Sequence, residues 1–162
     1  PPDESIAMSV LGLEEVKNAT KQVVIDENLS IEVASLDGIF ILKLNAWVDR
    51  HIEHNRDADD MGFILNNYLS INEERAARDH FDDIYSMEDF NYKTSGAKLL
   101  GMDMAKIIGD NKTTKDKLIE IIQTEIGKKE DSILINQIIE TNKNFNYEET
   151  MIFLQNIVEG LK

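Results

Sequence analysis

The spacing of apolar residues along this chain changes at Ser35. Before it, KQVVID and SIEVAS are rich in Val and Ile and are separated by a polar connection at 27–29, a pattern typical of a β-hairpin. From Leu36 onward, apolar residues recur at helical spacing. We therefore expect an α+β, mostly α chain, with a small N-terminal β-hairpin element followed by a helical array. Residues 1–35 would form the β-containing part and 36–162 the helical region, together one compact domain.

Helix start signals and apolar spacing predict the individual helices. Ser35 is a candidate N-cap for a helix that continues to about His51. Ser70-Ile71-Asn72-Glu73 fits a capping box that would start a helix ending at Phe81, and Asn146, three residues before Glu149, marks the start of the last helix. The remaining predicted helices cover 13–19, 58–69, 95–108, 114–126, 131–142 and 147–160. Residues 85–94 are predicted to be a loop.

The charge balance excludes some classes of partner. The chain has 162 residues, with 17 basic and 31 acidic side chains, a net charge of −14 and a pI near 4.5. A protein that follows a phosphate backbone is usually basic, so we expect no extended DNA binding and no contact with an anionic membrane. A local basic pocket could still hold one nucleotide.

The lack of cysteine and of long apolar runs points to a cytoplasmic location. Without cysteine the chain has no disulfide framework and no thiolate metal site, which suits a reducing compartment. The longest apolar runs are far shorter than the ~20 residues that span a bilayer. The chain begins Pro1-Pro2-Asp3 without methionine, so we expect a processed or truncated product.

A lysine lies inside the most apolar stretch of the chain, IFILKLNAWVDR. On a helix, Lys43 and Arg50 are two turns apart and line up beside Trp47, and this helix is expected to be largely buried. Asp57 and Asp60, three residues apart, share a face of the next helix. A buried ammonium is costly unless it is paired. The cluster is therefore either a structural ion-pair network or a set of cations, held by acids, beside a phosphate or nucleotide pocket.

Several ordered segments resemble a known family. These are PPDESIAMSVLGLEEV, a hairpin ending VASLDGIFILKLNAWVDR, then RDADDMGFILNNYL and AKLLGMDMAKIIG. Together they resemble the C-terminal half of predicted bacterial nucleotidyltransferases of the AbiEii/AbiGii toxin-like group, within the DNA polymerase beta-like superfamily. The resemblance runs from residue 1 to about 109. Its signature falls on Lys43, Asp49, Arg50, Arg56, Asp57 and Asp60.

The resemblance implies transfer of a nucleoside monophosphate from a nucleoside triphosphate to RNA, protein or another acceptor. It implies nucleotide binding by Lys43, Arg50, Asp57 and Asp60. Mg²⁺ is expected for the intact family enzyme.

The superfamily's metal-binding acids are missing from this chain. They follow a Gly-Ser turn as paired acids two apart on a strand, where both carboxylates point at the same two metal ions. Here the only Asp-x-Asp is 57–59, at the start of a predicted helix, where residues two apart diverge by about 200°. We therefore expect no bound metal and no transferase activity from this polypeptide by itself, and the catalytic residues are unknown.

Other groups of residues are weaker candidates for a site. His51 and His54 could chelate a metal, but solvated residues at a helix end are the favoured interpretation. The aromatic side chains of Tyr85, Phe90 and Tyr92 could stack on a base, although covering the core is favoured. Gly96 and Gly101 could allow close helix packing.

Two functions remain open. The first is the nucleotide-binding or acceptor-binding part of a nucleotidyltransferase. The second is a non-catalytic helical domain that binds a protein partner or a second copy of itself through exposed helix faces, with the charged cluster purely structural.

Overall fold

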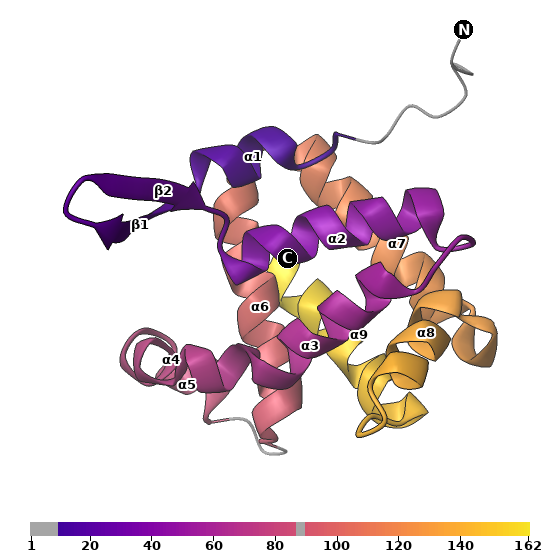
Figure 1. The fold of residues 1–162 in the computed structure, drawn as a ribbon. Coiled ribbons are helices and arrows are strands. Elements are labelled where there is room, and N and C mark those ends of the chain that lie inside the picture. Colours follow the sequence, from indigo (N-terminus) through magenta and orange to yellow (C-terminus); the bar gives the residue numbers. More distant parts are fainter. Residues whose placement is uncertain (1–9, 87–89) are drawn as a thin grey trace, which may run out of the picture.

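The computed structural model describes residues 10–86 and 90–162. It contains a two-stranded antiparallel sheet followed by a helical array, so the predicted fold class is confirmed (Figure 1). The elements are α1 (Leu13–Asn18), β1 (Lys21–Asp26), β2 (Leu29–Val33), α2 (Leu36–Arg50), α3 (Arg56–Ile71), α4 (Glu73–Asp79), α5 (Phe81–Ile84), α6 (Tyr92–Ile108), α7 (Lys112–Gly127), the 3-10 turn η1 (Lys129–Asp131), α8 (Ile133–Thr141) and α9 (Tyr147–Leu161).

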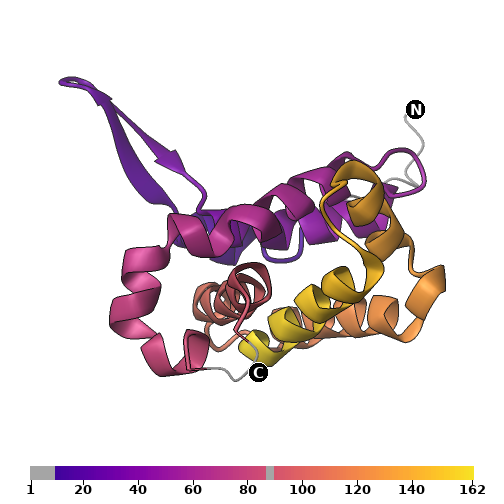
Figure 2. The same cartoon turned by 90° about the horizontal axis from the view of Figure 1, so that it is seen from below.

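The helices pack around one hydrophobic core. Helix α6 contacts α9 along most of its length and also packs on α3, while α3 packs in turn on α2 and α8. Helices α2 and α3 lie side by side above the α6–α9 pair, and α7 and α8 close one end (Figures 1 and 2). The α2–α3 pair carries the four charged residues singled out in the sequence.

Helix α2 is largely buried, as its composition predicts. Phe40, Ile41 and Leu44 are almost fully inaccessible to solvent and join the core. Val48, in the last turn of the same helix, is 40% exposed.

Helices α3, α6 and α9 approach one another closely at glycines of α6 and α9. A Cβ at Gly96 would lie 3.1 Å from the backbone nitrogen of Leu69 on α3. A Cβ at Gly101 would lie 2.3 Å from the carbonyl oxygen of Ile157 on α9, and one at Gly160 would lie 2.3 Å from the carbonyl oxygen of Lys98. The predicted role of Gly96 and Gly101 in close packing is therefore confirmed.

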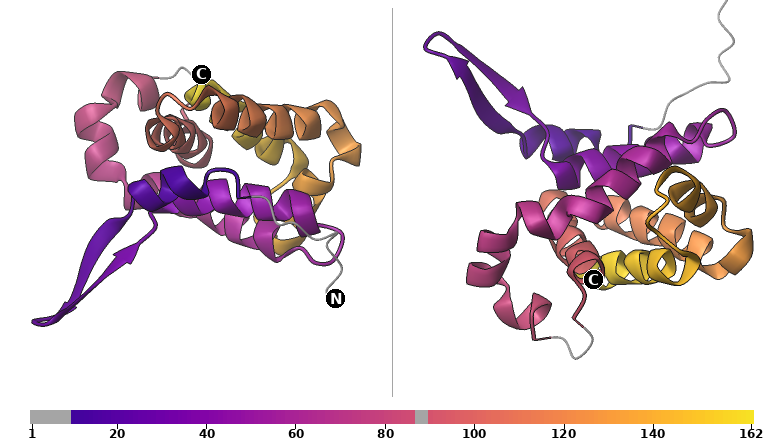
Figure 3. Two further views of the ribbon diagram at one scale, coloured as in Figure 1. Left: turned by 90° about the horizontal axis from the view of Figure 1, so that it is seen from above. Right: turned by 60° about the horizontal axis from the view of Figure 1, so that its bottom comes forward.

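The predicted hairpin is present, and it projects away from the helices. Strand β1 pairs with β2 in a register that places Val23 opposite Ile31 and Lys21 opposite Val33. Every strand residue is exposed. Figure 3 shows the hairpin as an arm that extends from the N-terminal end of α2.

The predicted capping box at 70–73 is wrong. The Ser70 hydroxyl donates to the carbonyl of Asn67 inside α3 and caps nothing. Helix α3 instead continues to Ile71, because the buried Tyr68 and Leu69 hold its last turn on the core. Helix α4 then starts at Glu73 without a side-chain cap, and it ends at Asp79 rather than at Phe81.

The predicted loop at 85–94 is too long at its C-terminal end. The side chain of Asn91 accepts hydrogen bonds from the backbone N–H groups of Lys93 and Thr94, so α6 begins at Tyr92. Asn146 caps α9 by accepting from the Glu149 N–H, as predicted. Residues 87–89 of the predicted loop lie outside the described residues.

Within residues 10–86 and 90–162, no helix is both long enough and apolar enough to cross a bilayer.

Candidate functional site

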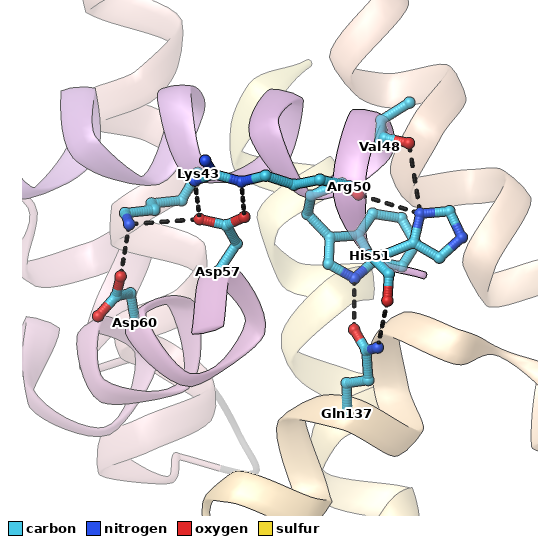
Figure 4. A network of polar contacts seen from close by, with 8 residues as sticks. Lys43, Val48, Arg50, His51, Asp57, Asp60 and Gln137 are labelled. Atoms are coloured by element: carbon cyan, nitrogen blue, oxygen red, sulfur yellow. Dashed lines mark hydrogen bonds and ion pairs between the residues drawn. The ribbon is translucent and has the colours of Figure 1, made fainter. Parts of the chain in front are cut away.

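The four charged residues predicted as a cluster meet between α2 and α3 (Figure 4). Arg50 donates two hydrogen bonds to Asp57, from Nε to Oδ2 at 2.7 Å and from Nη2 to Oδ1 at 2.8 Å. The Lys43 ammonium lies 3.3 Å from Asp57 Oδ1 and 2.5 Å from Asp60 Oδ2. One carboxylate, that of Asp57, thus holds both cations.

The connection between the helices explains why these residues meet. Helix α2 ends at Arg50 and α3 begins at Arg56, so the two helices run back along each other from a short turn. Asp57, in the first turn of α3, therefore faces the last turn of α2, and its charge is favourable at a helix N-terminus. Lys43 is two turns back along α2, opposite Asp60, and its long side chain reaches both acids.

Burial differs sharply within the cluster. The Asp57 side chain is 1% exposed, while those of Lys43, Arg50 and Asp60 are 29%, 39% and 51% exposed. Burial alone would raise the Asp57 pKa, but hydrogen bonds and charges from Arg50 and Lys43 outweigh it and hold the pKa below its ordinary value. The Asp60 hydrogen bond is the main reason that the pKa of Lys43 is raised. Lys43, Arg50 and Asp57 are therefore charged at neutral pH.

A cleft of about 430 Å³ opens beside the two cations. Its walls come from the segment around α1 and from the outward side of α2. Lys43 and Arg50 line it together with the apolar side chains of Leu13, Leu42 and Ala46. The cleft thus combines an apolar surface with two cations that are already paired with Asp57 and Asp60.

Two further positions of the family-like signature are next to cluster residues in the sequence, Asp49 beside Arg50 and Arg56 beside Asp57. Asp49 lines the cleft from the side of α2 that faces α1, and Arg56 is exposed at the first residue of α3. Asp59 is exposed whereas Asp57 is buried, so the predicted divergence of this Asp-x-Asp pair is confirmed.

His51, at the end of α2, and His54, in the turn that follows, are half-buried rather than fully solvated. The His51 ring stacks on Trp47 with centroids 4.6 Å apart, and its Nδ1 lies 3.0 Å from the Trp47 carbonyl oxygen. The Nδ1 atom of His54 is buried without a hydrogen-bond partner. In the part of the chain that the structure describes, no three acidic or histidine side chains gather closely enough to hold a metal ion.

The predicted aromatic group is a row of rings rather than a pocket. Tyr85 stacks on Phe90 with centroids 5.3 Å apart, and Phe90 meets Tyr92 edge-on at 5.9 Å. Tyr85 packs against the core, while Phe90 and Tyr92 are 39% and 41% exposed. Covering the core therefore accounts for Tyr85 only.

A second buried carboxylate escaped the sequence analysis. Asp103 on α6 accepts a hydrogen bond from the Tyr68 hydroxyl at 2.8 Å, two from Arg75 and one from Lys106. Burial raises its pKa, but these donors outweigh burial and lower it. The available signal was an acid in the middle of the apolar run GMDMAKIIG, the counterpart of Lys43 in its own apolar run.

No protein family model, curated protein or solved structure matches this chain. The resemblance to nucleotidyltransferases rests on the ordered sequence segments alone.

Proposed function

We propose that this chain supplies the nucleotide-binding part of a nucleotidyltransferase, in which Lys43 and Arg50 bind the phosphates of a nucleoside triphosphate or of the acceptor. Asp57 and Asp60 orient these two cations. The observation that carries the proposal is the convergence of Lys43 and Arg50, seven residues apart, on one buried carboxylate at the edge of an apolar cleft.

The unequal burial of the two acids suggests how phosphate would enter. Asp57 is enclosed and fixed by Arg50, so it keeps both cations in place. Asp60 is half exposed, and its contact with Lys43 can be exchanged for a phosphate oxygen at little cost, because exposed ion pairs contribute only about 0–1 kcal/mol. The apolar walls of the cleft would then receive the base or sugar.

The catalytic metal belongs to the complete enzyme in this proposal. Mg²⁺ would supply charge neutralisation during transfer, and no group of described residues in this chain gathers to hold it. We therefore expect nucleotide binding without transfer from this polypeptide by itself. The location we propose is the cytoplasm, in keeping with a chain that has no cysteine.

The competing interpretation is that the cluster only joins α2 to α3. Both interpretations predict the ion pairs seen here, but they differ for Lys43→Ala. Arg50 still pairs with Asp57 in this variant, so the fold should persist. The nucleotide site should lose its ammonium under the first interpretation, and no ligand response should exist to lose under the second.

Calorimetric titration distinguishes them. The wild-type chain is titrated with ATP, GTP, CTP and UTP in the presence of Mg²⁺, and the titrations are repeated with Lys43→Ala. Lys98→Ala serves as the matched control, because Lys98 is also a partly buried helical lysine paired with an acid, Glu159, but on α6.

We expect saturable binding of at least one nucleotide to the wild type and to Lys98→Ala, and its loss in Lys43→Ala. Absence of binding to all four nucleotides would contradict the proposal and leave Lys43 as a structural partner. Equal binding by the wild type and both variants would show that the nucleotide binds at a site that does not include Lys43.

A second candidate function is protein interaction without catalysis. The exposed hairpin with its Val and Ile side chains favours it, and the hairpin lies beyond the end of α2 opposite to Arg50. The two functions are compatible because they use different parts of the molecule.

A further inference from the structure

The β1–β2 hairpin is a surface that the nucleotide proposal does not use. Within the described residues the two strands pair only with each other, so both outer edges carry backbone N–H and C=O groups without a strand partner. All eleven strand residues are exposed. A two-stranded sheet of this kind is only marginally stable in water, and a bare strand edge invites pairing with another chain.

The register gives the hairpin two unlike faces. One face is mainly aliphatic, because the pairing of Val23 with Ile31 puts both side chains on the same side of the sheet. Val33 at the base and Leu29 near the turn lie on this face as well. The four side chains are 38–49% exposed. The other face is mainly polar, and there the Gln22 side chain donates a hydrogen bond to Ser30 at 3.1 Å. One face therefore has the aliphatic composition of a sheet face that packs on a core, although its side chains are exposed among the described residues.

The charges on the arm indicate what could pair with it. Between 22 and 32 the charged residues are Asp26, Glu27 and Glu32, all acidic, and the only basic residue of the strands, Lys21, lies at the base. The chain as a whole carries −14. A second copy would bring the same acidic arm and the same net charge, so repulsion opposes pairing of two copies.

We propose that the hairpin is a docking edge for an extended, basic β-strand of a different protein. The partner strand would add to an outer edge of the hairpin through main-chain hydrogen bonds, with apolar side chains packing on Val23 and Ile31 and Lys or Arg side chains facing the acids. This inference deepens the second candidate function and is independent of the nucleotide site.

The test uses the full chain labelled with nitrogen-15 and two short synthetic peptides. In the first, valine alternates with lysine; in the second, glutamate replaces lysine. Amide spectra follow each titration. The double variant Val23→Thr/Ile31→Thr keeps β-branched residues but removes the apolar pair. Ile152→Thr, at an aliphatic residue of α9 that is 42% exposed, is the control.

We expect the lysine peptide to shift the amide signals of β1 or β2 saturably, with weaker binding as salt rises. The double threonine variant should bind at least about tenfold more weakly, and Ile152→Thr should bind as the wild type does.

Three results would overturn the inference. The first is the absence of hairpin shifts with the lysine peptide, and the second is equal binding of both peptides. The third is a set of hairpin shifts that follow protein concentration alone, which would identify a second copy as the partner. No nucleotide is present in this test, so its failure leaves the nucleotide proposal untouched.

Discussion

At residue 57 a carboxylate lies inside the protein with 1% of its side chain exposed, and it stays charged because three donor groups point at it. A buried acid without such donors would take up a proton or unfold its surroundings. Asp60, one turn later, holds the same lysine but is open to solvent. The two acids of the cluster therefore have different energetic roles.

This difference predicts unequal effects of neutralising each acid. Asp57→Asn should lower the free energy of unfolding by about 2–3 kcal/mol, because hydrogen bonds between charged groups are lost at a buried site. Asp60→Asn should lower it by about 0–1 kcal/mol, as for exposed ion pairs. Urea unfolding of both variants measures the two values. Equal losses would contradict the assignment of Asp57 as the anchor.

Some contacts between side chains could be predicted from the sequence, and others could not. The Lys43 cluster was predictable because its members lie on two consecutive helices joined by a short turn, so local geometry brings them together. The contact between Asp103 and Tyr68 joins residues 35 apart, on α6 and α3, and depends on how those helices cross. Helical spacing within one segment carries no information on that crossing.

At the scale of elements, the tightest contact in the protein is between α6 and α9, where Gly101 and Gly160 let two backbones meet. Gly101→Ala should lower the free energy of unfolding by about 1–3 kcal/mol, because its Cβ would lie 2.3 Å from the Ile157 carbonyl oxygen. The gain in helix propensity, about 1 kcal/mol, is too small to offset a backbone collision at this distance.

Gly127→Ala is the control for that substitution. Gly127 ends α7, and a Cβ there would have no atom within 4 Å. Thermal unfolding of both variants should show a lower midpoint for Gly101→Ala and an unchanged or slightly higher midpoint for Gly127→Ala. A neutral Gly101→Ala would show that the two helices are farther apart than described.

The elements themselves were largely predictable, and their ends were less so. Long helices such as α7 and α9 follow from apolar spacing, and α9 also from its Asn146 cap. The capping-box pattern at 70–73 predicts the wrong end for α3. Burial of Tyr68 and Leu69 keeps the last turn of α3 helical, so the helix continues to Ile71. Tertiary packing, rather than the local pattern, sets the end of that helix.

For the whole molecule, three buried acids link stability to pH. Asp57, Asp103 and Glu125 are 1%, 5% and 3% exposed. At each, burial raises the pKa, but hydrogen bonds from neighbouring cations and donors lower it below its ordinary value of 3.8 for aspartate or 4.5 for glutamate. The unfolded chain therefore binds more protons than the folded chain once the pH falls below about 5.

The stability that these acids contribute is present above the unfolded-state pKa values and is lost as the pH falls through the lower folded-state values. Repulsion within a chain of charge −14 weakens as the pH falls from 7 toward the pI near 4.5, which acts in the opposite direction.

We expect stability to be greatest near pH 5–6 and to fall steeply below about pH 4. Urea unfolding midpoints across this range measure it, and Asp103→Asn should flatten the acid side of the profile. A midpoint that stays constant from neutral pH to about pH 3.5 would contradict the buried ion pairs.

Binding of phosphate by Lys43 and Arg50 can be observed at the two side chains themselves, by a titration with Mg²⁺–ATP monitored by side-chain NMR of the Lys Nζ and Arg Nε groups. The Arg50 Nε–H now donates to Asp57, and Arg78, paired with the exposed Asp79, provides an internal reference. We predict saturable shifts of the Lys43 and Arg50 signals while Arg78 stays unchanged. If the Lys43 and Arg50 signals stay in place at high nucleotide concentration, or move only together with Arg78, the cluster is a structural joint between α2 and α3.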